Sequence, residues 1–167
     1  MVLSGEDVDR VLADSSLSPQ EKRDRLRGCG NVGDCIERGL RTSLDAGDWT
    51  RFYWYVIAID SAPRESYVPI LIRALDMARD EPRIYAPDVI LALSDLASPT
   101  SVPVLARTIA WRTEQYGGDG FTLDAMDALL HIVTPESRAV IASLVEGDRI
   151  EVRELAQDIV ASPGRYW

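Results

Sequence analysis

Apolar residues recur along most of the chain at the three- and four-residue spacing of an amphipathic helix. The clearest runs are Val89, Ala92, Leu93, Leu96; Met126, Leu129, Leu130, Val133; and Val152, Leu155, Ala156, Ile159. No segment shows the sustained apolar–polar alternation of a half-exposed strand. Residues 53–59 resemble a strand in isolation, but their place in the repeat described next predicts a buried helix. The pattern therefore predicts an all-α protein.

The chain contains an internal repeat that prolines mark. Pro63, Pro99 and Pro135 are spaced 36 residues apart. Residues 85–96 align with residues 121–132, and the two segments share an aromatic residue, an Asp, an Ala-Leu pair and a closing aliphatic residue. The part of the chain near Pro63 matches less strictly. A fixed period of this length is typical of stacked helical repeats.

The marker prolines also predict how each repeat turns. At 98–99 and 134–135 a hydroxyl residue precedes the proline. The hydroxyl group can cap a helix, and the proline can occupy the first helical position, where its missing N–H is not needed. Residues 18–19 have the same arrangement, with Glu21 placed to complete a capping box. Each repeat is therefore predicted to be a helix, a tight turn at the proline and a second helix.

The period, the aliphatic spacing and the central turn resemble HEAT-like repeats, including the short type found beside phycobilin lyases. The resemblance covers about residues 49–161 and is closest within 86–105. Asp88 and Asp124 depart from it, because an Arg often opens the first helix of such repeats. The resemblance implies a short right-handed α-solenoid of stacked helix pairs, since one pair cannot bury its own apolar face.

Residues 1–167 are predicted to form a single domain with an N-terminal helical cap. Helices are expected in the cap at about 4–14, 19–27 and 33–46. The cap and the three HEAT-like helix pairs are assigned to residues 1–47, 48–82, 84–116 and 120–162.

The net charge of the chain indicates which classes of partner it can bind. The formal net charge is -9, and residues 113–167 contain ten acidic and four basic side chains. This balance disfavours nucleic acid, whose phosphates need clustered Lys and Arg. An acidic field can steer a basic protein to the surface, although the same charges also serve solubility.

Nothing in the sequence predicts a membrane protein. The N-terminal residues are acidic and do not have the composition of a secretory signal. No apolar run approaches the roughly 20 residues that span a bilayer. We therefore expect no membrane association, a cytoplasmic location, and a monomer or weak dimer.

Few residues offer catalytic or metal chemistry. His131, the only histidine, lies in an apolar run and is predicted to be a partly buried structural residue, since no Gly-x-Ser-x-Gly elbow accompanies it. Cys29 and Cys35 cannot form a four-ligand zinc site; free thiols are preferred over a disulfide there. Residues 115–122 resemble a calcium repeat, but they occur once and Thr122 replaces its Asp. No metal, cofactor or catalytic residue is predicted.

Two regions are candidates for contact. The Gly-rich break at 115–122 is either a contact loop or a flexible connection between repeats. An aromatic and acidic patch is predicted around it, formed by Trp111, Glu114, Tyr116, Asp119, Asp124 and Asp127. The aromatic cluster at 49–55 is assigned to both core and surface, with core packing preferred over a binding hot spot. The C-terminal aromatic residues 166–167 are candidates to fold back on the last helix.

These features together predict a non-catalytic protein-binding module. Small, acidic HEAT-like chains without catalytic residues resemble some bacterial immunity proteins, which neutralise a toxin by binding it. An adaptor subunit of a larger complex is an alternative of the same class. The alternatives of a different class are a small lyase-like enzyme or a chromophore- or small-molecule-binding protein, which a deep pocket with a carboxylate of raised pKa would favour. The acidic balance disfavours a DNA glycosylase.

Overall fold

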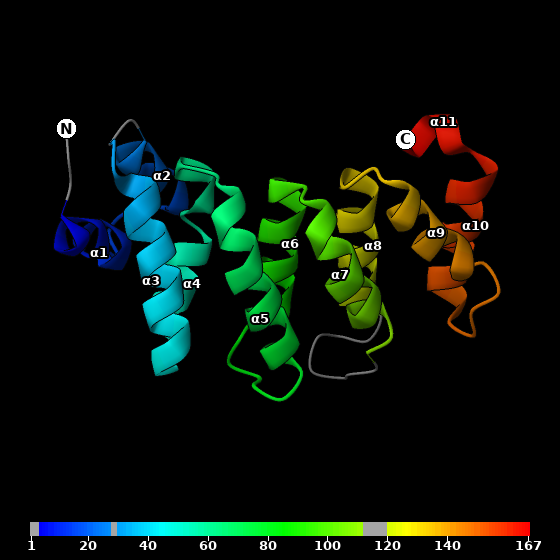
Figure 1. Cartoon of the computed structure of the whole chain (residues 1–167), viewed down its shortest axis with the longest axis horizontal. Helices are drawn as coiled ribbons and strands as arrows, with labels where there is room; N and C mark the ends of the chain where they lie inside the picture. Colours follow the sequence, from blue (N-terminus) through cyan, green and yellow to red (C-terminus); the bar gives the residue numbers. More distant parts are fainter. Residues whose placement is uncertain (1–3, 28–29, 112–119) are drawn as a thin grey trace. The chain divides into compact units, whose positions relative to one another are not determined.

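The structure is a computed structural model that describes residues 4–27, 30–111 and 120–167. Every regular element within these ranges is a helix, so the predicted all-α class is confirmed for them (Figure 1). The α-helices are α1 (Gly5–Ala13), α2 (Pro19–Leu26), α3 (Val32–Ala46), α4 (Trp49–Val56), α5 (Val68–Ala78), α6 (Ala86–Leu96), α7 (Val102–Ile109), α8 (Gly120–His131), α9 (Pro135–Ser143), α10 (Ile150–Ala161) and α11 (Pro163–Tyr166). Three 3₁₀ turns accompany them, η1 (Ile59–Ser61), η2 (Glu65–Tyr67) and η3 (Pro99–Ser101).

The chain divides into two compact units, residues 1–92 and residues 93–167, and the boundary falls within α6. The first unit contains the three helices expected of the N-terminal cap. Their observed bounds lie within a residue or two of the prediction. The single domain, the stacking of the helix pairs and the right-handed solenoid stay predictions.

Hydroxyl caps begin the first helices as the sequence indicates. The Ser18 hydroxyl accepts from the Glu21 amide at 3.3 Å, and the Glu21 carboxylate accepts from the Ser18 amide at 2.8 Å. Pro19 fills the first turn of α2, so the predicted capping box is confirmed. Ser4 and Asp7 form the same arrangement at α1. These caps satisfy amides that the first helical turn leaves without partners.

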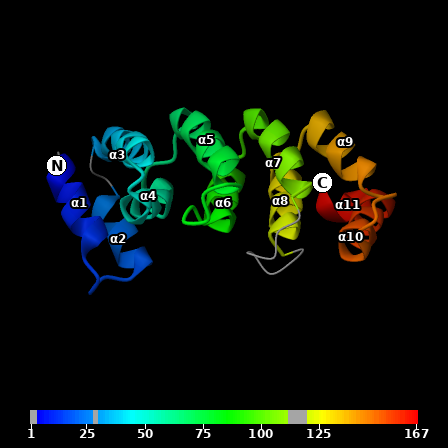
Figure 2. The same cartoon turned by 90° about the horizontal axis from the view of Figure 1, so that it is seen from below.

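The first unit is built around the pairing of α3 with α4. These two helices lie side by side, and α1 contacts both (Figure 2). Leu12, Ile36 and Leu40 are fully buried in this core, as is Tyr67. The Tyr67 hydroxyl lies 2.8 Å from the carbonyl oxygen of Ala62, so this large side chain is buried without leaving its polar atom unpaired.

A polar network ties α1 to α4 across the same core. The Tyr55 hydroxyl donates to Asp9, and Nη2 of Arg51 lies 2.6 Å from Oδ2 of the same carboxylate. Burial, more than these contacts, raises the pKa of Tyr55 to about 12. The Tyr55 ring lies directly over Gly39 of α3, where any side chain would meet it. Gly39 therefore permits the close approach of α3 and α4.

The second unit repeats the predicted turn at its marker prolines. The Thr134 hydroxyl accepts from the Ser137 amide at 3.0 Å, and Pro135 begins α9. The Ser98 hydroxyl accepts from the Thr100 amide at 3.3 Å, and Pro99 begins the short η3 that leads into α7. The prediction of a hydroxyl cap followed by proline is confirmed at both sites.

Arg149 ties three segments of the second unit together. Its Nη1 donates to the carbonyl oxygen of Ile109 at 2.8 Å, and its Nη2 donates to the hydroxyl of Thr122 at 2.7 Å. Thr122 is fully buried. The guanidinium therefore links the end of α7 and the start of α8 to the beginning of α10.

The predicted helix pair at 120–162 needs correction, because this region contains three helices, α8, α9 and α10. The break between α9 and α10 falls at the turn around Gly147, whose amide donates to the carbonyl oxygen of Leu144. The C-terminal residues fold back as expected. The Tyr166 hydroxyl donates to Asp158 of α10, and Arg138 of α9 lies 4.9 Å from the centre of the Trp167 ring.

Candidate functional site

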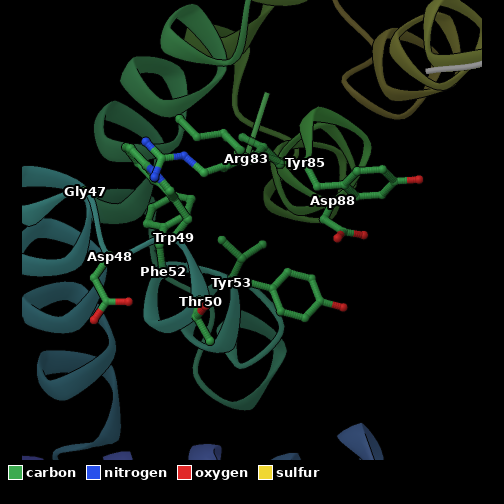
Figure 3. Close-up of a pocket in the computed structure, with 12 residues that line it drawn as sticks. Gly47, Asp48, Trp49, Thr50, Phe52, Tyr53, Arg83, Tyr85 and Asp88 are labelled. Carbon is green, nitrogen blue, oxygen red and sulfur yellow. The ribbon is translucent and has the colours of Figure 1, made fainter. Parts of the chain in front are cut away.

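The first unit contains a pocket of about 600 Å³ between α4, the end of α3 and the start of α6 (Figure 3). Its volume is in the range of ordinary ligand sites. The residues that line it are Gly47, Asp48, Trp49, Thr50, Phe52, Tyr53, Val56, Arg83, Ile84, Tyr85, Asp88 and Val89. All of them lie within the first unit. Aromatic side chains and a few charged groups therefore share one concave surface.

A tight turn from α3 into α4 forms one edge of the pocket. Gly47 ends α3 with a φ of 67°, a left-handed conformation that favours glycine. Asp48 follows at once and caps α4, because its carboxylate accepts from the Arg51 amide at 3.1 Å. The two helices are thus joined without a loop, and this places Trp49 at the pocket's edge.

The helical period of α4 determines which of its aromatic side chains are buried. Phe52, Tyr55 and Val56 follow the three- and four-residue spacing and are buried. Tyr53 lies off this face and is 45% exposed. The prediction that the cluster at 49–55 serves both core and surface is confirmed. The indole Nε1 of Trp49 is buried and has no hydrogen-bond partner among the described residues.

Arg83 closes one side of the pocket and is already neutralised. Its guanidinium lies 5.7 Å from the centre of the Trp49 ring. It also forms a two-pronged ion pair with Glu81, with nitrogen–oxygen distances of 2.8 and 2.6 Å. Hydrogen bonding to Arg83 lowers the pKa of Glu81 to about 2. The Arg83 guanidinium therefore contacts both an aromatic ring and a carboxylate.

Asp88, on the opposite side of the pocket, differs from Arg83 in its surroundings. It lies in the first turn of α6 and is half-buried. Among the described residues, no hydrogen bond or ion pair engages its carboxylate. Burial raises the pKa of Asp88 above its ordinary range. Burial, followed by the nearby charges of Asp88 and Tyr85, likewise raises the pKa of Tyr53.

The predicted acidic patch lies in the second unit and is only partly described. Trp111 follows α7, and its ring centre is 5.9 Å from that of Phe121. Asp124 and Asp127 are exposed on α8. Burial, and then the charge of Asp127, raise the pKa of Asp124. Of the other predicted residues, Glu114, Tyr116 and Asp119 lie outside the described residues. Within the part of the chain that the structure covers, no bond or ring contact joins Trp111 to either aspartate.

The prediction for His131 is wrong in one respect. Its side chain is 60% exposed and not partly buried. The reason is its register, because it lies one turn after the exposed Asp127, with Nδ1 3.6 Å from Oδ2 of that residue. Cys35 is a buried free thiol in α3, and burial raises its pKa. Cys29 lies outside the described residues.

The pocket itself was not predicted, although the sequence contains a signal for it. Tyr53 departs from the buried spacing of its helix, and Tyr85 and Asp88 are three residues apart at the start of another. What the sequence alone does not supply is the proximity of α4 to the start of α6.

Neither the described residues nor the comparisons with known proteins assign a metal site, a membrane span or a family to the chain. In the described ranges, no cluster of three or more His, Cys, Asp or Glu side chains could hold a metal ion. None of the described helices is long and apolar enough to cross a membrane. No protein-family model, curated protein or solved structure matches the chain significantly.

Proposed function

We propose that the chain is a non-catalytic protein-binding module that holds a basic partner protein, with the pocket of the first unit as its contact site. The observation that carries this proposal is the half-buried Asp88 carboxylate, which no cation neutralises among the described residues. A partly desolvated charge without a partner destabilises the free protein. A partner that supplies the missing cation would therefore gain affinity there.

Two further properties support a protein partner. Tyrosine and tryptophan are enriched among residues that dominate protein interfaces, and Tyr53 and Tyr85 are both well exposed at the pocket. The net charge of -9 attracts basic surfaces over a distance of about 8–10 Å at moderate ionic strength. Aromatic contact would supply affinity, and the acidic field would speed association and select against acidic partners.

The proposal includes an architecture. The helix pairs would stack as a HEAT-like right-handed α-solenoid, for which the proline-marked turns at Pro99 and Pro135 are the support. Such stacks present extended surfaces that bind other proteins. An adaptor subunit of a larger complex would use the same surface.

The most specific form of the proposal is an immunity protein that neutralises a basic toxin in a bacterial cytoplasm. Small size, strong acidity and an open aromatic pocket support it. The test is expression of the reading frames that adjoin the gene. One product should arrest bacterial growth, and co-expression of this chain should restore it. Restoration by a chain in which Tyr53 and Tyr85 are both alanine would contradict a role for the pocket.

The binding proposal can be tested without knowing the partner. A random peptide library displayed on phage would be selected on the immobilised full chain and counter-selected on the Tyr53→Ala/Tyr85→Ala variant. The expected peptides are basic, bind the wild-type chain more weakly as salt rises, and lose most of their affinity for the variant. Peptides that bind both proteins equally, or that carry no excess of basic residues, would contradict the proposal.

A second candidate is a small-molecule-binding or lyase-like protein, because a pocket of about 600 Å³ that contains a carboxylate of raised pKa favours that class. Asp88 would serve as the ligand-binding or proton-transferring group. Native mass spectrometry of the purified chain is the test. A bound organic molecule that is absent from the Asp88→Asn variant would favour this candidate over the protein partner.

A further inference from the structure

Two carboxylates at or beside the pocket are in contrasting states. The Glu81 carboxylate, which is outside the pocket lining, is paired through two nitrogen atoms with Arg83 of the lining, whose guanidinium in turn lies against Trp49. This is a complete arrangement of carboxylate, guanidinium and aromatic ring. Asp88 provides a carboxylate and its aromatic neighbours provide rings, but no described residue places a guanidinium between them.

The aromatic neighbours of Asp88 are Tyr53 and Tyr85. Figure 3 shows the Asp88 carboxylate between the two phenol rings, with all three side chains on the same side of the pocket. The pKa of Tyr53 is raised in part by the charges of Asp88 and Tyr85, which agrees with this proximity. The rings are 45% and 56% exposed, so a side chain from another molecule can reach them.

We propose that the pocket is a receptor for one arginine side chain of the partner, whose guanidinium lies between Tyr53 and Tyr85 and pairs with the Asp88 carboxylate. This inference rests on the proposed function, because it assumes that the pocket binds a protein. It specifies in addition which side chain of the partner enters the pocket.

Arginine fits these walls better than lysine does. A guanidinium is planar, weakly hydrated, and able to stack on aromatic rings while it makes two parallel bonds to a carboxylate. An ammonium is strongly hydrated and needs three acceptors. Asp88 is the one carboxylate of the pocket lining that has no role in a described ion pair or helix cap. Two aromatic faces and one carboxylate therefore match a guanidinium more closely than an ammonium.

The test is an NMR titration of the full chain with four small probes. These are N-acetyl-arginine N-methylamide, the corresponding lysine and citrulline compounds, and agmatine. Citrulline has the shape of arginine without its charge, and agmatine is a free guanidinium compound. We expect the arginine compound to shift resonances of Tyr53, Tyr85 and Asp88. It should bind several times more tightly than the lysine compound and at least about tenfold more tightly than the citrulline compound.

Matched variants localise the effect. Asp88→Asn keeps the shape of the side chain and removes the charge, so arginine binding should weaken about tenfold or more. Asp124→Asn removes the carboxylate at the matching repeat position and should leave arginine binding within twofold. Circular dichroism confirms that both variants are folded. Equal losses of arginine affinity in the two variants would mean that net charge alone causes the binding, and would overturn the proposed site.

The remaining outcomes separate this inference from the proposed function. If peptides selected from the library depend on Tyr53 and Tyr85 but carry no preferred arginine, the arginine receptor is wrong and protein binding stands. If agmatine binds at least tenfold more tightly than the capped arginine, the pocket is a receptor for a small guanidinium compound and the protein-borne source is wrong. No detectable shift with any probe at tens of millimolar also overturns the inference.

Discussion

Asp88 in the first unit and Asp124 in the second stand 36 residues apart, at matching positions of the sequence repeat. Both carboxyls have a raised pKa, and burial is the largest cause for each. Burial alone raises the pKa of Asp88, whereas the charge of Asp127 adds to the effect of burial on Asp124. Asp88 lies in an aromatic pocket, and Asp124 is exposed on a helix. The same repeat residue thus lines a pocket in one surrounding and is a surface charge in the other.

The difference comes from residues outside the repeat match. Tyr53 and Arg83 lie outside the aligned segments 85–96 and 121–132. The turn at Gly47, which joins α3 to α4 at the edge of the pocket, also lies in the first unit. The repeat therefore determines where helices begin and end, and the individual residues of the first unit determine the site. Four predictions test this distinction.

The largest expected effect concerns the close approach of α3 and α4. Gly39→Ala places a methyl group in the Tyr55 ring, which is held by its bond to Asp9 and cannot move away. Overpacking of this kind should lower the free energy of unfolding by about 2–3 kcal/mol. Chemical denaturation measures the loss, and faster hydrogen exchange should appear in α3 and α4.

Gly33→Ala is the matched control. Its methyl group would meet the side chain of Arg64, which is partly exposed and can shift. The better helix propensity of alanine then offsets the contact, and the stability should change by less than about 1 kcal/mol. Equal losses in the two variants would mean that the Tyr55 ring does not determine the packing of the first unit.

The second unit should depend most on Arg149. Arg149→Ala removes the bonds to Thr122 and Ile109 and leaves the buried Thr122 hydroxyl and the Ile109 carbonyl without this donor. Leaving such groups unsatisfied costs about 1–3 kcal/mol, so a loss near 2 kcal/mol is expected in thermal or chemical unfolding. Arg153→Ala, which removes one bond to the Gly147 carbonyl, should cost less than half as much. A larger effect for Arg153 would contradict the assigned role of Arg149.

The third prediction compares the left-handed helix ends of the two units. Gly47 has a φ of 67° and Ala97 a φ of 48°, and only glycine adopts this conformation without strain. Gly47→Ala should therefore destabilise the protein by about 1 kcal/mol, and Ala97→Gly should stabilise it by a somewhat smaller amount. Differential scanning calorimetry gives both signs. Two changes of the same sign would show that the backbone conformation is not the cause.

Helix boundaries could be predicted from the sequence because they depend on local chemistry. The hydroxyl–proline pairs at 18–19 and 134–135 begin helices where expected. Exposure was harder to predict, as His131 shows, since an apolar sequence neighbourhood does not fix the face on which a residue lies. The pocket could not be predicted, because it depends on a contact between helix ends some 35 residues apart. The acidic patch at 111–127 stays a prediction for the residues that the structure does not describe.

The smallest expected effect returns to the two carboxylates. A raised pKa in the folded state means that ionisation disfavours folding, so stability falls as the pH rises through that pKa. Asp88→Asn should therefore stabilise the protein slightly at neutral pH, by at most about 1 kcal/mol. The gain over the wild-type chain should shrink as the pH is lowered through the raised pKa of Asp88 and vanish below the ordinary pKa of the unfolded chain, where the carboxyl is protonated in both states. Melting temperatures measured across pH test this sign.

The same melting measurements, repeated at different salt concentrations, distinguish Asp88 from Asp124. Burial contributes most to the raised pKa of Asp124, and repulsion from Asp127 contributes the rest. Salt screens only the repulsion, so only that part of the gain from Asp124→Asn should shrink at high ionic strength. The gain from Asp88→Asn comes from burial and should persist. Asp88→Asn is also expected to weaken arginine binding while it stabilises the fold. A carboxylate that lowers stability but raises affinity for arginine acts as a binding group. A variant that lost both stability and affinity would instead make Asp88 a structural residue.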